Sequence, residues 1–405
     1  MTAPPLTLFA ESGDVASSQG PTLLRMEVHG PRARPAVLQL WRDTEARLSN
    51  QRLMCSSAWT ETWLKHYGSL VPHRFAVAWR GDTCCGMALL TNGVRQFDGP
   101  MPLKTWHIGT AGEPDADSVC IEYNALLIGH EDREDFARQL IAWTSSQSDC
   151  DENRLDGFSA ADIAPLLAAQ PQAVATRKPS HYFDLNAARE ANVAPIELLG
   201  RRTRASLRRS LRQLGQPTGE WANTPERAEA MLLELMDLHQ ARWEALGEPG
   251  VYSSRRFREF HLDLVQRLVP LGKMGLYRVA SSNGVIGVSQ VFLDDNRALL
   301  YQGGWAPQTG DASPGLVVDY LFMEECLRRG FDQFDFLAGE SGYKRRLSTH
   351  EAELVWAVAR RPRLKFAVLD NLRWIKRTLT GLDESPLNEN SPIPTSTTLD
   401  AVESD

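Results

Sequence analysis

A carboxylate stands in the middle of an apolar run in the last quarter of the chain. Asp335 lies between Phe334 and Phe336, in a segment that is otherwise typical of a buried strand. A carboxylate buried there needs a partner or a raised pKa. Asp335 could therefore accept a proton as a general base, or position the group that does. The alternative is a structural ion pair with Lys344 or with an arginine.

A histidine and a tryptophan form a second candidate pair. His239 and Trp243 are four residues apart in a segment with helical periodicity, so they share one face of the helix. The intrinsic pKa of histidine suits proton transfer at neutral pH, which makes His239 a second candidate base. We expect Trp243 to contact a substrate beside it. The alternative is a histidine with a structural role.

A helix start with the features of an anion site lies near residue 313. Asp311 or Ser313 can cap this helix, Pro314 suits its first turn, and Gly315 lets backbone approach closely. The N–H groups and the macrodipole of a helix N-terminus attract anions, and a pyrophosphate is the natural guest. The alternative is an ordinary helix cap. The residues expected to form the anion site are Ser313, Gly315, Leu316 and Val317.

Three cations follow the strand that carries Asp335. A turn of small residues, 339–342, leads into Tyr343, Lys344, Arg345 and Arg346. The cations could hold phosphate groups or an acidic ligand, and we assign Arg345 to phosphate binding. The alternative is a solvated basic turn.

A carboxylate and an amide lie in the strand that we predict over residues 119–129. The alternation of side chains along a strand places Glu122 and Asn124 on one face and Tyr123 on the other. Facing a cleft, Glu122 could bind an ammonium group, with Asn124 beside it as a second substrate contact. The alternative for Glu122 is a surface carboxylate.

Other catalytic motifs are missing from the sequence. The segment "GESG" is one residue short of the G-x-S-x-G elbow, and neither HExxH nor a Walker loop occurs. The six cysteines form no C-x-x-C motif, so we expect reduced, buried thiols and no metal site.

The 405 residues suit two or three domains. The hydrophobic fraction of 42% is typical of a soluble globular protein, and the net charge of −7 is unevenly spread. No apolar run approaches the roughly 18 residues of a membrane span, and the N-terminus has no signal-peptide pattern. We therefore expect a cytoplasmic protein.

Helical and strand-like segments alternate along the chain, which predicts an α/β fold. After residue 195 the order is helices, a three-strand meander, a helix and two strands, which favours an acyltransferase-type domain over a Rossmann or barrel fold. The predicted organisation is a flexible N-terminus (1–20), a first domain (21–194), a second domain with the anion site (195–360), an amphipathic helix (361–382) and a disordered acidic tail (383–405).

The amphipathic helix 361–382 leaves two interpretations open. Its apolar residues recur at helical spacing and are flanked by basic ones, as in helices that lie on a membrane surface. Such a helix could equally dock on the protein itself.

Several segments together resemble a known family. The stretches "SPGLVVDYLFMEECLRRG" and "FDFLAGESGYKRR" are similar to bacterial acetyltransferases of the cellulose-biosynthesis-protein type, which are double-domain relatives of the GNAT N-acyltransferases. Weaker similarity lies in "SSAWTETWLKHYG", "RRTRASLRRSLRQLG" and "LHQARWEALG", in the family's order. The segment "TGDASPGL" departs from the usual GNAT phosphate-loop pattern, as is common in this branch.

The resemblance implies tandem GNAT-like domains, as in the Fem-type aminoacyltransferases. It implies acyl-CoA or an acyl carrier thioester as donor and an amine as acceptor, on a sugar, a polysaccharide precursor or a peptide lysine. An amine would attack the thioester carbonyl directly, with Asp335 or His239 as base. Tyr343 would protonate the leaving thiolate, and Lys344 would face the site. No DNA partner is implied.

Two other functions remain open from the sequence. A Fem-type transferase dependent on aminoacyl-tRNA would use the six arginines of residues 201–212 along a phosphate backbone. A non-catalytic GNAT pair would only bind an acyl or peptide partner.

Overall fold

The computed structural model describes residues 23–371, except 49–51, 95, 99–100, 308–311 and 369–370. The expected flexible N-terminus (1–20) and acidic tail (383–405) lie outside the described residues.

The first half of the chain opens with a strand and two helices, β1 (Leu24–His29), α1 (Arg34–Arg47) and α2 (Ser57–His66). The α2 helix begins where the side chain of Ser56 accepts the N–H of Trp59, as serine does at an N-cap. The other elements of this half are β2 (His73–Arg80), β3 (Thr83–Asn92), β4 (Gln96–Asp98), β5 (Met101–Leu103), β6 (Thr105–Ile108), β7 (Leu127–Ile128), α3 (Arg133–Ser146), β8 (Glu152–Ser159) and α4 (Ala160–Ala168).

The strand expected over residues 119–129 is wrong for most of its length. Only β7 forms at its end, and Cys120 and Tyr123 have positive φ angles of 45° and 55°. Those angles turn the chain away from an extended path. Glu122 and Asn124 therefore do not project together from one face of a strand.

The second half follows the predicted order of elements except for two additions, the strand β10 among the helices and the helix α11 between the last two strands. The long helix α8 (Pro225–Ala245) begins where the hydroxyl of Thr224 accepts the N–H of Arg227. The remaining elements are β9 (Val174–Asp184), α5 (Leu185–Ala191), α6 (Pro195–Leu198), α7 (Arg201–Gln213), β10 (Thr218–Trp221), α9 (Arg255–Leu268), β11 (Met274–Ser281), β12 (Gly284–Asp294), β13 (Arg297–Trp305), α10 (Pro314–Arg328), β14 (Gln333–Ala338), α11 (Gly342–Leu347) and β15 (His350–Arg360).

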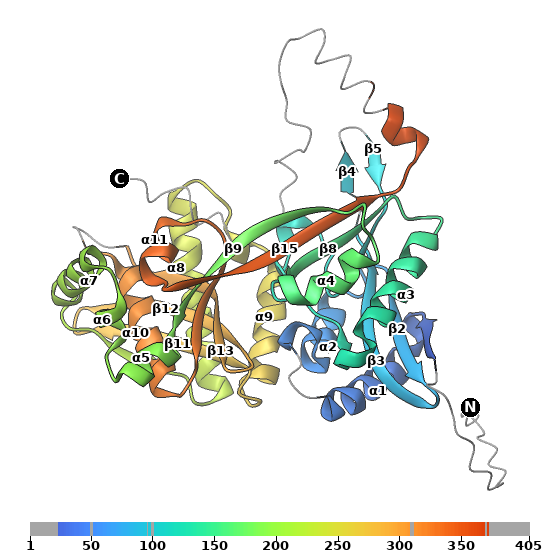
Figure 1. Ribbon diagram of the computed structural model, residues 1–405. Coiled ribbons are helices and arrows are strands. Elements are labelled where there is room, and N and C mark those ends of the chain that lie inside the picture. Colours follow the sequence, from blue (N-terminus) through green and yellow to red (C-terminus); the bar gives the residue numbers. More distant parts are fainter. Residues whose placement is uncertain are drawn as a thin grey trace, which may run out of the picture.

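One mixed sheet runs through both halves of the described chain (Figure 1). Its strand order is β1-β2-β3-β6-β8-β15-β9-β14-β13-β12-β11-β10, with β7 added beside β3. The last strand, β15, pairs with β8 of the first half on one side and with β9 on the other. In Figure 1, β9 and β15 are the long strands that pass between the two halves. The sheet is therefore continuous where the sequence predicts a boundary between domains.

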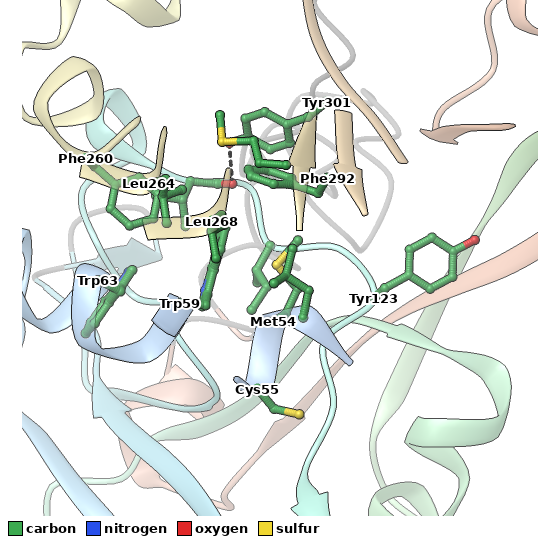
Figure 2. Close-up of a cluster of buried hydrophobic side chains, with 14 of the residues drawn as sticks. Met54, Cys55, Trp59, Trp63, Tyr123, Phe260, Leu264, Leu268, Phe292 and Tyr301 are labelled. Carbon is green, nitrogen blue, oxygen red and sulfur yellow. Dashed lines mark hydrogen bonds between the residues drawn. The ribbon is translucent and has the colours of Figure 1, made fainter. Parts of the chain in front are cut away.

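A hydrophobic core is also shared between the halves. The indole of Trp59 in α2 makes edge-on contacts with Phe260 of α9 and Phe292 of β12, with ring centroids 5.3 Å apart in both pairs. Figure 2 shows these rings close together with Met54 from the first half and Tyr301 from the second. Burial of such large rings stabilises the packing of one half on the other.

The start of the predicted C-terminal helix docks on the first half. Phe366 is buried against Leu103, and the ammonium of Lys365 pairs with Asp151. By contrast, Leu364 is 88% exposed. Residues 372–382 lie outside the described part of the chain. Among the described residues, no helix has the length and apolarity to cross a membrane.

Candidate acyl-donor cleft and neighbouring polar groups

Two parallel strands separate in the middle of the second half. Strands β13 and β14 pair only at their N-terminal ends, from Arg297 with Gln333 to Leu299 with Asp335. Beyond that point the register of β14 against β9 is irregular, and Leu337 takes a positive φ of 62°. Backbone groups at the C-terminal end of β14 therefore form hydrogen bonds with side chains.

A cleft of about 470 Å³ lies at the N-terminus of α10, beyond the end of β13. The guanidinium of Arg242 lies 4.4 Å from the ring centroid of Trp305. A Cβ atom on Gly315 would lie only 3.3 Å from the same ring, so glycine allows the indole to cover the helix start. The lining residues are Arg242, Trp305, Ser313, Gly315, Leu316, Asp319, Tyr343 and Arg346.

Three of the four residues predicted for the anion site line this cleft. Ser313 occupies the N-cap position, but its side chain caps no N–H group of the helix. Its own N–H donates to the hydroxyl of Ser210 in α7, 3.2 Å away. Val317 is fully buried in the core of the second half and does not line the cleft, because its position on α10 faces the sheet.

The basic segment after β14 is a short helix, α11, and not a turn. Tyr343 and Arg346 are three residues apart on one face and line the cleft. Lys344 and Leu347 share another face, which is buried. Arg345 is exposed and does not line the cleft, so the structure places Arg346 where the sequence predicted Arg345.

Asp335 is buried and fully engaged by hydrogen-bond donors. Its carboxylate accepts the hydroxyl of Tyr123 at 2.5 Å, the hydroxyl of Ser180 at 2.7 Å and the backbone N–H of Leu337 at 2.7 Å. The expected direct ion pair with Lys344 or an arginine does not form in the described residues. The bond from Tyr123 holds the loop of the first half against β14, so the geometry suits a positioning residue better than a base.

His239 is poorly suited to accept a proton. The indole N–H of Trp243 donates to its Nε2 atom at 2.9 Å, so the proton of the neutral ring lies on Nδ1. The nitrogen that could act as a base is therefore occupied. Burial, with a smaller effect from Arg242, lowers the pKa of His239 to about 4. Trp243 is also buried and is not part of the lining of this cleft, so the expected contact with a substrate does not fit the geometry.

Glu122 and Lys344 flank the last peptide of β14. The Oε2 atom of Glu122 accepts the N–H of Ala338 at 2.8 Å, and the ammonium of Lys344 donates to the carbonyl of Ala338 at 2.8 Å. Burial raises the pKa of Glu122 to about 7, although the N–H of Ala338 and the charge of Lys344 act in the opposite direction.

Asn124 does not line the cleft at α10. Its side chain is fully buried, and its Nδ2 atom donates to the carbonyls of Ile108 and Asp156 at 2.8 and 3.1 Å. These bonds fix the loop onto β6 and β8, so the expected substrate contact does not fit the geometry.

Three lining residues escaped the sequence assignment. Trp305 is the last residue of a predicted strand and precedes the predicted helix start, a position that could have suggested it. Arg242 adjoins Trp243, but the register of α8 turns the arginine to the cleft and the tryptophan to the core. No signal in the sequence distinguishes Asp319 from other polar residues of α10.

Comparison with known proteins supports the fold. Residues 201–345 match the acetyltransferase (GNAT) domain. The matched segment contains β10 to β14, α10 and the lining of the cleft except Arg346. The predicted α/β fold with GNAT-like architecture is therefore confirmed. A search of curated proteins found no match to this chain.

Solved structures show the same fold over most of the chain. A structure of FemX covers 78% of this chain and 95% of its own, with a TM-score of 0.54 and 11% identity. The C-terminal domain of a protein described as a lysylphosphatidylglycerol synthetase, from Agrobacterium fabrum, covers 80% of this chain and 92% of its own, with a TM-score of 0.50 and 12% identity.

Proposed function

We propose that the protein is an N-acyltransferase that moves an acyl group from acyl-CoA, or from an acyl carrier thioester, to an amine. The observation that carries this proposal is the cleft at the start of α10. A helix N-terminus, the guanidinium groups of Arg242 and Arg346, and the indole of Trp305 meet there. This combination suits the pyrophosphate of a CoA thioester.

The separation of β13 from β14 gives the thioester a place to react. With the phosphates at α10, the pantetheine arm would run toward the open ends of these strands, where Glu122 and Lys344 flank Ala338. The amine nitrogen would form a bond to the thioester carbonyl carbon, and the carbon–sulfur bond would break. The protein's main contribution would be to orient donor and acceptor.

Glu122, which bonds to the end of β14 and does not line the cleft at α10, would take the proton from the amine. One of its oxygens is anchored by the N–H of Ala338, and its pKa of about 7 suits transfer at neutral pH. Tyr343, in the lining of the cleft, would give a proton to the leaving thiolate. Asp335 would position the loop that carries Glu122.

The class of acceptor follows from the family resemblance. It comprises amino sugars, polysaccharide precursors and lysine-type amines of peptides, in the cytoplasm or at a membrane surface. Helix 361–382 would provide the contact with a membrane.

A second candidate is a transferase that takes its acyl group from aminoacyl-tRNA. One observation favours it: α7 packs against the start of α10 through Ser210, and its Arg209 and Arg212 are exposed. A phosphate backbone lying along these arginines would lead toward the cleft.

The test compares two neighbouring arginines of α11. Arg346→Ala should weaken binding of acetyl-CoA, measured by calorimetry, by roughly tenfold or more, because a charge-assisted contact contributes about 1.5–3 kcal/mol. Arg345→Ala removes the same charge outside the cleft and should change the affinity little. Absence of binding to acetyl-CoA and to long-chain acyl-CoA by the wild-type protein would refute the donor assignment, and salt-sensitive binding of tRNA would then support the second candidate.

A further inference from the structure

A second cavity, of about 480 Å³, lies in the first half of the protein. It shares no lining residue with the cleft at α10. Its walls come from β6, β8, β15 and the loop of residues 109–124. The lining residues are His107, Ala111, Gly112, Glu113, Asp115, Ser118, Cys120, Ile121, Arg154, Asp156 and Trp356.

The charges of the two cavities are opposite in sign. Three carboxylates, Glu113, Asp115 and Asp156, line the first-half cavity. Its arginine, Arg154, is already paired with the buried Glu152 at 2.9 Å. The cavity is therefore electronegative and would repel the phosphates of a CoA donor, whereas it would attract a cation.

Two buried acceptor atoms in this lining accept no hydrogen bond of normal geometry from the described residues. Glu113 is 5% exposed; its Oε1 atom accepts the N–H of Val119 at 2.8 Å, and its Oε2 atom has only the indole of Trp63 as a weak neighbouring donor. Burial raises the pKa of Glu113 to about 7. The ring of His107 bonds to Asp156 through Nδ1 at 2.6 Å, and its Nε2 atom has no partner in the part of the chain that the structure describes. Unsatisfied buried polar atoms are rare, and a bound group with N–H donors would satisfy them.

We propose that this cavity binds a small organic cation with a primary ammonium group. The ammonium would donate hydrogen bonds to the carboxylates of Glu113 and Asp156, and its positive charge would stabilise their ionised forms. The ring of Trp356 already has the ammonium of Lys178 5.2 Å from its centroid, so the carboxylates, and not the indole, supply the attraction.

A metal ion is the competing cation. Among the described residues, no group of three or more histidine, cysteine, aspartate or glutamate side chains is arranged to hold one. The lining itself therefore favours an organic cation, and metal ions enter the test as a separate arm.

The test is calorimetric titration of the full chain with putrescine, spermidine and lysine amide, with 1,4-butanediol as the neutral control. We expect saturable binding of at least one amine and none of the diol. Glu113→Gln and Asp156→Asn should each weaken amine binding at least tenfold. The new amides keep an oxygen that can accept the N–H of Val119 or the proton of His107, and thermal unfolding checks that both variants fold. Glu134→Gln, on the exposed surface of α3, is the matched control and should leave the affinity unchanged.

Three results would overturn the inference: no saturable binding of any of the three amines, equal binding of amine and diol, or amine affinity that neither variant changes. Saturable binding of Zn²⁺ or Mg²⁺ in place of the amines would overturn it as well. The inference does not rest on acyl transfer. Arg346→Ala should leave amine binding intact, so failure here and failure of the donor assignment can be distinguished.

Discussion

The substitution Glu122→Gln should stabilise the protein at alkaline pH and leave its stability unchanged in acid. Glu122 is 4% exposed, and burial raises its pKa from 4.5 to about 7. Below pH 4.5 the side chain is protonated in both the folded and the unfolded state. As the pH rises toward 7, the unfolded chain loses this proton while the folded protein still holds it, so the free energy of unfolding falls.

The size of the effect follows from that interval. At about 1.4 kcal/mol per pH unit, a pKa displaced from 4.5 to about 7 lowers the free energy of unfolding by roughly 3 kcal/mol once the pH exceeds 7. Glutamine cannot ionise, and its amide oxygen can still accept the N–H of Ala338. The variant should therefore match the wild type near pH 4.5 and exceed it by up to roughly 3 kcal/mol at pH 8.

Urea unfolding followed by circular dichroism, at half-unit steps from pH 4.5 to 8, measures this difference directly. Glu113→Gln, in the first half of the chain, should show a similar dependence of the free energy of unfolding on pH, since the pKa of Glu113 is also about 7. Glu134→Gln, which is exposed, should run parallel to the wild type. If the Glu122→Gln curve is parallel to the wild-type curve at all pH values, or lies below it at pH 8, the assignment of a buried carboxyl with a raised pKa is wrong.

Two further substitutions test the packing. Trp59→Ala should lower the free energy of unfolding by about 3–5 kcal/mol, because the indole fills the core between the halves. Urea titrations monitored by CD and by tryptophan fluorescence should show that both halves are destabilised together. Separate transitions, with only the first half affected, would contradict a shared core. Gly304→Ala should lower the free energy of unfolding by about 1–3 kcal/mol in the same titration. The new Cβ atom would lie 2.6 Å from the carbonyl oxygen of Leu235 in α8, so the strand or the helix must shift. An unchanged free energy of unfolding would show that β13 packs more loosely against α8 than described.

Local patterns were enough to predict most elements. The helical periodicity around His239 and Trp243 and the three-strand meander that follows predicted α8, β11, β12 and β13 correctly. These signals come from neighbours in sequence, so they are readable without tertiary contacts. The strand expected at residues 119–129 failed because its apolar residues pack against the second half from a loop, and burial alone does not distinguish a loop from a strand.

The candidate site was predicted in part for the same reason. The start of α10 was found from Ser313, Pro314 and Gly315, whose residue types fit a helix N-terminus. The sequence predicted Arg345 and not Arg346 for phosphate binding, because a basic run interpreted as a turn has no helical face that distinguishes the two side chains. Once α11 forms, the spacing of three residues puts Tyr343 and Arg346 on the same side.

The α/β class, the helix starts and an acyltransferase-like order of elements in the second half can be predicted from the sequence alone. The pairing of β15 with β8, and the bond between Glu122 of the first half and Ala338 of the second, appear only in the folded protein. Strand partners and buried polar contacts join residues far apart in the chain. They are fixed by which backbone groups remain unpaired after the whole sheet has formed, and that is not encoded in any single segment.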